Sequence, residues 1–321
     1  MSGGDRVLVT HHLPGGAGSG LDDAWEVWEG PGAMPRVELM RRAGSLDGLL
    51  CMLVDRIDGE FLAAASRLRV ISQMAVGVDN IDLAAARNAG IPVGHTPGVL
   101  TETTADTAFA LLAAACRRLP EGQDALRRGE VGEWDPDYLL GGDLFDTTMG
   151  IVGLGRIGQA LARRASGFGM RVVYSGPRAK AAAAALDAEH VHLDELLGMS
   201  DHVVITAPLT AGTRHIIDGA ALARMRDGAT LVNVARGGLI DHEALTREAV
   251  TGRIRIALDV TEPEPLPPGH PLLALPNVLV VPHLGSASVR TRRAMAEMAI
   301  ANLRAGLAGE PLPAPVGGIH S

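Results

Sequence analysis

Three polar side chains that together suit the reduction of a carbonyl group follow apolar runs in the second half of the chain. Arg236 comes directly after TLVNVA, Glu264 shortly after RIALDV, and His283 after VLVVP. A guanidinium clamps a carboxylate in a fixed fork geometry. An imidazole titrates near neutral pH and can deliver a proton to a carbonyl oxygen, and a carboxylate on its other ring nitrogen fixes its tautomer. The set therefore suits a 2-keto acid as the substrate.

Each of these residues also has a structural interpretation. Arg236 precedes Gly237 in a glycine-rich turn, and Glu262 competes with Glu264 for the supporting role. The chain contains 11 histidines, of which His270 stands in a proline-rich loop. Spacing alone leaves the catalytic and the structural interpretations open.

A glycine fingerprint, GLGRIG at 153–158, follows an apolar run and opens a stretch with helical spacing. Gly153 permits a tight turn, Gly155 lets the backbone approach a pyrophosphate, and Gly158 lets the helix pack close to the strand. The first N–H groups of that helix and its positive dipole end suit phosphates. The other glycine-rich stretch, PGGAGSG at 14–20, lacks this spacing and is predicted to be a flexible surface loop. We therefore predict a dinucleotide site at 153–158.

The residue that selects between two dinucleotides is missing from its usual place. An acidic residue about 20 positions after the start of the fingerprint holds the ribose 2′-hydroxyl of NAD, but this chain has YSGPR at 174–178. Ser175 and Arg178 can bind a 2′-phosphate, with Lys180 as a weaker second cation. The alternative is that Arg178 is an ordinary solvated charge and the site accepts either cofactor. The sequence favours NADP(H), with NAD(H) as the alternative.

Composition excludes several classes of protein. The 321 residues are 47% hydrophobic and 21% charged, which is typical of a core-forming globular chain. A formal net charge of -8 argues against a nucleic-acid surface. The two cysteines, Cys51 and Cys116, fit neither a disulfide framework nor a zinc site, and we expect no metal. The N-terminus lacks an apolar signal segment and the longest apolar helical run, 105–116, is too short to cross a bilayer, so we expect a cytoplasmic protein without membrane contact.

Short apolar runs alternate with helical patterns along most of the chain. The runs are continuous, as expected for parallel strands that are covered on both faces. The pattern predicts an α/β fold with parallel sheets. Strands are predicted at 6–10, 68–72, 91–94, 149–153, 171–175, 202–207, 230–235, 255–260 and 278–283, and helices at 60–65, 83–88, 100–119 and 286–309. The segment 121–147 is predicted to be rich in loops.

A domain boundary is predicted near 97–100, where a strand ends and a long helix begins. The last amphipathic helix can return to the first domain, so that the second domain is inserted into a discontinuous first one. The predicted domains are residues 1–98 with 287–321 and residues 99–286, and the second contains the predicted dinucleotide site.

The chain resembles the D-2-hydroxyacid dehydrogenase family from end to end. The resemblance rests on the motifs GLGRIGQALARRASGFGMRV, LVNVARGGLIDHEAL, ALDVTEPEPLPPGHPLL and VPHLGSAS, and on an upstream segment that begins QMAVGVDNIDLAAARNAG. The stretch CRRLPEG is similar to the glyoxylate reductase/hydroxypyruvate reductase branch. The resemblance implies two Rossmann-like, doubly wound parallel-sheet domains, of which the substrate domain is flavodoxin-like, and a homodimer formed through the cofactor domain.

The resemblance also implies residue roles. Arg236 corresponds to the catalytic arginine, His283 to the general acid/base, and Glu264 rather than Glu262 to the supporting acid, where the formate dehydrogenase relatives carry glutamine. The implied substrate-binding residues are Leu53, Val76, Gly77 and Trp134, the last resembling a tryptophan that reaches the active site of the neighbouring subunit. The implied cofactor-binding residues are Thr104, Gly153, Gly155, Arg156, Ile157, Gly158, Ser175, Arg178, Ala207, Pro208, Thr213, Val234, Ala235, Asp259 and Gly285.

The resemblance favours NADPH-dependent reduction of glyoxylate to glycolate or of hydroxypyruvate to D-glycerate, with the proton supplied by His283. Two other functions stay open. One is the same chemistry on another acid, such as D-lactate, phosphoglycerate or a bulkier keto acid. The other is a dinucleotide-sensing regulatory protein, as with the transcriptional corepressors that resemble this family.

Overall fold

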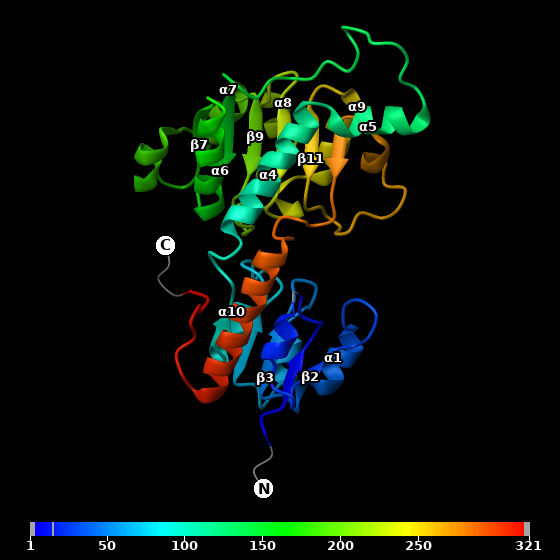
Figure 1. Ribbon diagram of the computed structural model, residues 1–321. Helices are drawn as coiled ribbons and strands as arrows, with labels where there is room; N and C mark the ends of the chain where they lie inside the picture. Colours follow the sequence, from blue (N-terminus) through cyan, green and yellow to red (C-terminus); the bar gives the residue numbers. More distant parts are fainter. Residues whose placement is uncertain (1–3, 15, 318–321) are drawn as a thin grey trace. The chain divides into compact units, whose positions relative to one another are not determined.

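The computed structural model describes residues 4–14 and 16–317, and it divides into two compact units (Figure 1). Unit 1 comprises residues 1–100 and 287–321, and unit 2 comprises residues 101–286. The division falls two residues after the expected boundary at 98/99, since the long helix that opens unit 2 begins at Thr101. Each unit has its own parallel sheet and its own apolar core.

Unit 1 contains a five-stranded parallel sheet in the order β2-β1-β3-β4-β5. Asp58 and Asp82 cap two of its helices by accepting hydrogen bonds from Phe61 N–H and Ala85 N–H, which satisfies first-turn donors. The strands are β1 (Val7–Val9), β2 (Glu26–Val27), β3 (Gly48–Cys51), β4 (Val70–Gln73) and β5 (Val93–Gly94). The helices are η1 (Ala17–Gly20), α1 (Arg36–Ala43), α2 (Gly59–Ala64), α3 (Leu83–Asn88) and α10 (Val289–Ala308).

The C-terminal helix α10 is part of the core of unit 1. Gly306 packs so closely on Val70 of β4 that a Cβ at this position would collide with the valine side chain. Ser72 donates a hydrogen bond to the Ala299 carbonyl oxygen at 2.7 Å. The fully buried Asn302 donates to the His95 carbonyl oxygen at 2.9 Å and accepts from Ala314 N–H at 2.9 Å. The last helix therefore completes the fold of the first hundred residues.

Unit 2 contains a seven-stranded parallel sheet in the order β12-β11-β10-β9-β6-β7-β8. Helices α4 and α6 bury their apolar residues on one face of it, and α7, α8 and α9 bury theirs on the other. The strands are β6 (Thr148–Val152), β7 (Arg171–Ser175), β8 (Ala188–His190), β9 (His202–Ile205), β10 (Thr230–Asn233), β11 (Arg255–Leu258) and β12 (Val278–Val280). The helices are α4 (Thr101–Cys116), α5 (Leu119–Arg128), α6 (Arg156–Gly167), η2 (Ala181–Leu186), α7 (Leu193–Met199), α8 (Gly219–Arg224), η3 (Gly237–Leu239), α9 (His242–Thr251) and η4 (Pro271–Ala274).

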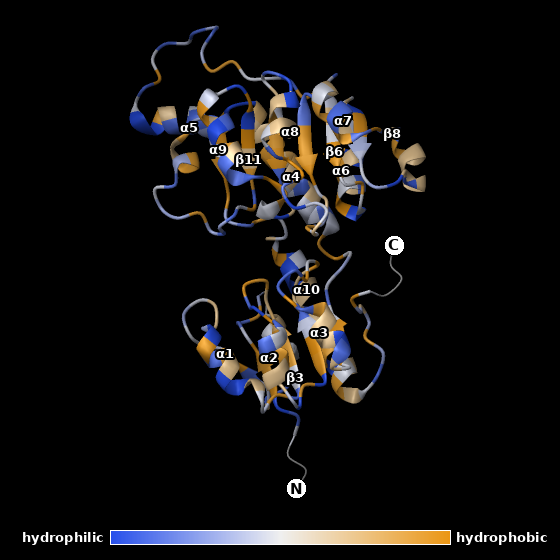
Figure 2. Ribbon diagram, turned by 180° about the vertical axis from the view of Figure 1, so that it is seen from behind, coloured by the Kyte–Doolittle hydropathy of each residue, from blue (hydrophilic) through white to orange (hydrophobic). Residues whose placement is uncertain are grey.

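Parallel strands with helices on their faces confirm the predicted fold class of two doubly wound α/β domains. In Figure 2 the hydrophobic colours concentrate on the strands, whereas surface helices such as α1 and α5 mix hydrophobic and hydrophilic residues. In a doubly wound sheet, ligands bind outside the carboxyl ends of the strands where the strand order reverses. In unit 2 that reversal lies between β6 and β9.

Several local predictions were wrong. Residues 121–128, in the segment predicted to be rich in loops, belong to the helix α5; Pro120 near its start and Gly129 at its end, with φ 69°, are the usual punctuation of a helix. The stretch at 14–20 is not simply a loop, because η1 forms there with Ala17 buried. The strand β3 and the helix α1 were not predicted. The short edge strands β2 and β8 were also not predicted, because two or three residues carry no readable periodicity.

Candidate active site

The glycine loop after β6 has the geometry that a dinucleotide requires. Gly153 has φ 100°, and a Cβ there would lie 2.7 Å from the Cα of Ala207 at the end of the neighbouring β9. A Cβ on Gly158 would lie 2.5 Å from the Gly153 carbonyl oxygen, whereas one on Gly155 would meet nothing within 4 Å. The loop is therefore closed on the protein side and open at Gly155. A pyrophosphate can approach there and meet the unpaired first N–H groups of α6, which begins at Arg156.

Thr206, which sequence reasoning missed, fixes this loop. Its hydroxyl donates a hydrogen bond to the Gly153 carbonyl oxygen at 2.6 Å, and its own N–H donates to the Val152 carbonyl oxygen at 2.9 Å. Thr206 thereby joins the carboxyl ends of β6 and β9, the two strands on either side of the order reversal. The sequence could have pointed to Thr206, because this residue directly follows the apolar run HVVI. Its bond to Gly153, 53 positions earlier, cannot be predicted from spacing along the chain.

The turn after β7 presents Ser175 and Arg178 beside the glycine loop. The Gly153 N–H donates to the Ser175 carbonyl oxygen at 2.9 Å, so the two loops are directly bonded. The hydroxyl of the buried Tyr174 accepts from the Lys180 N–H at 2.8 Å and holds the far end of the turn. Arg178 is exposed, and within the described ranges its guanidinium forms no ion pair. Its charge is thus available to a ligand.

The other residues expected in the cofactor cleft follow β9 and β10. The Thr213 hydroxyl donates to the Pro208 carbonyl oxygen at 2.7 Å and closes the turn between them. Ala207 and Val234 are buried directly beyond the strand ends, and the Ala235 N–H donates to the Asn233 side chain at 3.0 Å. These residues continue the carboxyl edge from the glycine loop toward β10.

Arg236, Glu264 and His283 follow β10, β11 and β12, which are neighbouring strands. His283 Nδ1 lies 2.6 Å from Glu264 Oε1. Because an ionised carboxylate only accepts, Nδ1 carries the hydrogen of this bond and Nε2 is left as the exchangeable site. The adjacent Glu262 instead pairs with Arg214, at 3.0 Å and 3.1 Å from its two carboxylate oxygens. Of the two competing glutamates, the structure thus sets Glu264 against the histidine.

The charge state of Glu264 follows from its surroundings. Burial opposes its ionisation, but the hydrogen bond and charge of His283, the Thr261 N–H and the Arg236 charge together hold the pKa of Glu264 below its usual value. The carboxylate is therefore ionised at neutral pH and favours the protonated imidazole.

The Arg236 loop is held by a buried amide that sequence reasoning missed. The Asn233 side chain donates to the Arg236 carbonyl oxygen at 2.8 Å, and Asn233 is fully buried. Gly237 packs directly on the backbone at Thr261, where any side chain would collide with the Thr261 carbonyl. This contact keeps the Arg236 loop against the loop that carries Glu264.

Asp259 anchors the loop that carries His283. Its carboxylate oxygens accept from Leu284 N–H at 2.5 Å and Gly285 N–H at 3.0 Å, and its carbonyl oxygen accepts from His283 N–H at 2.9 Å. Burial raises the pKa of Asp259, although the two N–H bonds and the His283 charge oppose the rise. A Cβ on Gly285 would lie 2.9 Å from Asp259 Oδ2 and 3.4 Å from Thr104 Cγ2, so these three residues lie together.

The expected substrate residues of unit 1 follow two neighbouring strands. Leu53 comes after β3, and Val76 and Gly77 come after β4. The Val76 carbonyl oxygen lies 3.0 Å from His95 Nδ1, while in the part of the chain that the structure describes the Val76 and Gly77 N–H groups donate to no acceptor. Two adjacent free N–H groups can bind a carboxylate.

Trp134 lies away from the Arg236–Glu264–His283 group of its own chain. It is 87% exposed, in the segment between α5 and β6 that leads into the amino end of β6 (Figure 1). The three polar residues lie at the opposite, carboxyl edge of the same sheet. A single chain therefore does not bring Trp134 to them.

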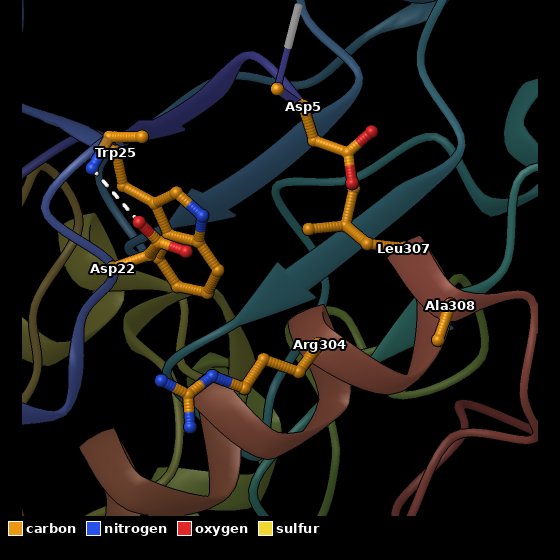
Figure 3. Close-up of a pocket in the computed structure, with 8 residues that line it drawn as sticks. Asp5, Asp22, Trp25, Arg304, Leu307 and Ala308 are labelled. Carbon is orange, nitrogen blue, oxygen red and sulfur yellow. Dashed lines mark hydrogen bonds between the residues drawn. The ribbon is translucent and has the colours of Figure 1, made fainter. Parts of the chain in front are cut away.

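Unit 1 also has a pocket of about 310 Å³, drawn in Figure 3. It lies where β1 and β2 begin, at the edge of the sheet opposite the loops that carry Leu53 and Val76. Asp5 in its wall is paired with Arg69 at 2.9 Å, and the Arg304 guanidinium lies 5.8 Å from the Trp25 ring centre and donates to the Gly20 carbonyl oxygen. Its charged groups are matched within the fold, so we assign it a structural role.

The described part of the chain shows neither a membrane-spanning helix nor a metal site. The helices located there include none with the length and apolar composition of a membrane span. Among the same residues, no group of three or more histidine, cysteine and acidic side chains is arranged to hold a metal ion.

A glycine loop at the order reversal, together with an arginine, a glutamate and a histidine on three adjacent strand ends, defines an oxidoreductase of the dinucleotide-binding α/β class. The family model for the D-isomer specific 2-hydroxyacid dehydrogenase, NAD binding domain, matches residues 109–285. The chain belongs to the D-2-hydroxyacid dehydrogenase family, as its motifs predicted.

The similarity to relatives extends over nearly the whole chain. It is 43% identical over 317 residues to a glyoxylate reductase/hydroxypyruvate reductase from Homo sapiens, covering 96% of each chain. The crystal structure of the TT0316 protein from Thermus thermophilus is 49% identical and superposes with a TM-score of 0.90, covering 97% of this chain and 99% of that one. An NADPH-dependent glyoxylate/hydroxypyruvate reductase from Sinorhizobium meliloti, solved with NADP and malonate, is 30% identical with a TM-score of 0.85, covering 97% and 96%.

Proposed function

We propose that the protein reduces glyoxylate or hydroxypyruvate, or both, with a nicotinamide dinucleotide as the hydride donor. The observation that carries the proposal is the 2.6 Å bond between His283 and Glu264 on a strand end beside the Arg236 loop. The relatives from Homo sapiens and Sinorhizobium meliloti bear names that specify this activity.

In the proposed reaction each polar residue has one task. The free N–H groups of Val76 and Gly77 and the guanidinium of Arg236 bind the substrate carboxylate, and Leu53 contacts the substrate's substituent. The bound dinucleotide supplies the hydride that the carbonyl carbon accepts. His283 Nε2 donates the proton that the carbonyl oxygen needs, and Glu264 stabilises the imidazolium before the transfer and keeps the ring oriented.

We propose NADP(H) as the preferred cofactor, with NAD(H) as the alternative. The support is the turn after β7, where Ser175 and the exposed charge of Arg178 stand in place of a carboxylate that would repel a 2′-phosphate. The relative from Sinorhizobium meliloti was solved with NADP. Thr104, Pro208, Thr213, Val234, Ala235, Asp259 and Gly285 are the residues proposed to line the rest of the cofactor site.

We further propose a homodimer formed through unit 2. Apolar side chains are exposed on α5 and the segment after it, among them Leu126 at 64%, Trp134 at 87% and Phe145 at 61%. Exposed apolar side chains of this kind are typical of a protein interface. Trp134 of one subunit would then serve the other subunit's active site. Two free, buried cysteines support a reducing, cytoplasmic location.

Replacing His283 by alanine tests the proposed chemistry. General acid catalysis is worth about 10²–10⁴-fold, so we expect kcat for glyoxylate and hydroxypyruvate to fall by at least about a hundredfold. Binding of NADPH, followed by its fluorescence, should be unchanged. The exposed His192 provides the control variant His192→Ala, which should retain full activity.

Retention of more than about a hundredth of the rate by His283→Ala would exclude His283 as the proton donor. A second candidate function is reduction of a bulkier 2-keto acid by the same residues, because the pocket around Leu53 sets the size of the substituent. Comparing kcat/KM for glyoxylate, hydroxypyruvate, pyruvate and phenylpyruvate with NADPH decides between them.

A further inference from the structure

Two loops of unit 1 lie side by side at the carboxyl edge of its sheet. Residues 52–57 follow β3, residues 74–80 follow β4, and the two strands are paired. Under the proposed function the first loop carries Leu53 and the second carries the N–H groups of Val76 and Gly77. The inference below rests on that assignment and concerns what holds the two loops at a fixed spacing.

The side chain of Asn80 bridges the two loops. Its Nδ2 donates to the Met52 carbonyl oxygen at 3.0 Å and to the Asp55 carbonyl oxygen at 2.7 Å, and its Oδ1 accepts from Gln73 Nε2 at 2.8 Å. Both amide hydrogens are therefore used on the opposite loop. The Asn80 backbone carbonyl also accepts from Ile57 N–H at 2.9 Å. One residue thus makes three bonds to a segment more than 20 positions earlier.

The Gln73 side chain holds the Asn80 amide in its orientation. Its side chain is fully buried at the end of β4, and its second amide hydrogen points to the Gly77 carbonyl oxygen at 3.4 Å. Its Oε1 accepts from the Cys51 thiol at 3.0 Å. Burial, with the nearby Asp55 charge, raises the pKa of Cys51 well above its usual value, so the thiol keeps the hydrogen it donates.

Asp55 holds the first loop, residues 52–57, in a closed turn. It is 3% exposed, and its Oδ2 accepts from Met52 N–H at 2.7 Å and from the Thr10 hydroxyl at 2.5 Å. The Asp55 N–H returns a bond to the Met52 carbonyl oxygen at 3.1 Å. The loop that carries Leu53 is consequently a closed turn, and Asn80 is bonded to both of its ends.

The bonds fix the second loop in one orientation. The carbonyl oxygens of Val76 and Gly77 are engaged by His95 and Gln73, while their N–H groups have no acceptor in the segments that the structure describes. Val76 is 37% exposed and Gly77 is half-buried, so these N–H groups are accessible, and two adjacent accessible donors on a braced loop suit an anion. This observation is independent of the Asn80 bridge, and both concern the same loop.

We propose that Asn80 and Gln73 are positioning residues that hold the Leu53 loop at a fixed distance from the Val76 and Gly77 N–H groups. The spacing determines how tightly the carboxylate of a 2-keto acid binds and how large a substituent fits beside it. Neither residue contacts the reacting atoms. Their loss should therefore raise KM for the keto acid and relax selectivity, while kcat and cofactor binding are retained.

The test replaces Asn80 by alanine in the full-length protein. KM for glyoxylate should rise about tenfold, with kcat within about threefold of wild type and the Kd for NADPH unchanged. The ratio of kcat/KM for phenylpyruvate to that for glyoxylate should increase. Gln73→Met, which keeps the volume of a buried side chain, should also raise KM, because it removes the donor to Asn80 Oδ1. The double variant should raise KM by less than the product of the two single effects, because both substitutions remove the contact between Gln73 and Asn80.

A matched control separates positioning from simple loss of stability. Asn277 in unit 2 donates to two carbonyl oxygens, of Ala249 and Ile254, each at 3.0 Å. Asn277→Ala should lower Tm by a similar amount and leave KM unchanged. An Asn80→Ala protein that is folded and has KM within about twofold of wild type overturns the proposal, as does an equal rise of KM in Asn277→Ala.

Hydrogen exchange of the backbone amides tests the role of Asn80 without any measurement of enzyme activity. Wild-type protein that reduces none of these acids with NADPH or NADH would disprove the function. The amides of Met52, Asp55 and Ile57 then report on the brace, because all three are hydrogen-bonded within or across the loops. Faster exchange of these amides in Asn80→Ala, and not in Asn277→Ala, supports the brace. Equal exchange overturns it.

Discussion

At the scale of single residues, the proposed chemistry depends on the pair of His283 and Glu264. The two residues are 19 positions apart in the chain, and their bond of 2.6 Å joins the ends of two neighbouring strands. Glu264 stays ionised as the pH falls toward its usual value of 4.5, because its contacts to His283 outweigh the cost of burial. The pair thus stabilises the fold above that pH and loses its contribution as the pH falls through the lowered pKa.

Replacing Glu264 by glutamine keeps an acceptor for the imidazole but removes the charge that favours its protonated form. Proton transfer requires an oriented ring with its proton on Nε2, so we expect kcat/KM for glyoxylate at neutral pH to fall about tenfold. Steady-state rates of the wild type and the variant check this. Glu262→Gln is the matched control, because Glu262 pairs with Arg214; an effect in that variant alone would reverse the assignment.

At the scale of elements, the proposed preference for NADP(H) depends on the turn between β7 and η2. It is bonded to the glycine loop through Gly153 N–H and the Ser175 carbonyl oxygen, so its side chains lie where a ribose substituent would be. A charge-assisted bond contributes about 1.5–3 kcal/mol. Arg178→Ala should therefore raise KM for NADPH by about 10–100-fold and leave KM for NADH nearly unchanged.

The control for that experiment lies on the same strand. Arg171, at the other end of β7, is paired with Glu189 at 2.6 Å, and Arg171→Ala removes an equal charge without touching the turn. The preference for NADPH over NADH should be unaffected in this variant. An unchanged preference in Arg178→Ala would show that the turn does not recognise the 2′-phosphate.

At the scale of the whole molecule, the exposed apolar side chains on α5 and after it predict assembly. We expect light scattering to give a mass about twice the 33.4 kDa of one chain. Leu126→Asp combined with Phe145→Asp should yield the monomer and lower kcat/KM, because Trp134 would lose its place in the other subunit's site. Val250→Asp, at an equally exposed apolar position on α9, is the control and should stay dimeric. A monomeric wild type with full activity would refute the proposed dimer.

Much of the fold could be predicted from the sequence, because strands, turns and helix starts depend on residues that are close together in the chain. Continuous apolar runs predicted most of the parallel strands, although not β3. The glycine spacing at 153–158 predicted the loop after β6, since a tight turn and a close helix are local requirements. The long motifs predicted the family. The helix α5 was missed for another reason. Pro120 and Gly129 are residues typical of its two ends, but Leu119 and Leu126 are exposed, so the apolar pattern of this segment did not indicate a buried helix face.

What the sequence alone determined is the set of groups available for chemistry: an arginine, a histidine and carboxylates after apolar strands, and a dinucleotide loop followed by Arg178 instead of an acid. The tertiary structure decided which of these groups meet. Spacing left Glu262 and Glu264 open, and in the structure Glu264 bonds His283, as the family resemblance implied. The bond of Asn80 to a loop 28 positions earlier was not predicted. The physical reason is that a parallel sheet brings together strand ends separated by whole helices, and the hydrogen bonds formed there depend on ångström distances that spacing along a chain does not specify.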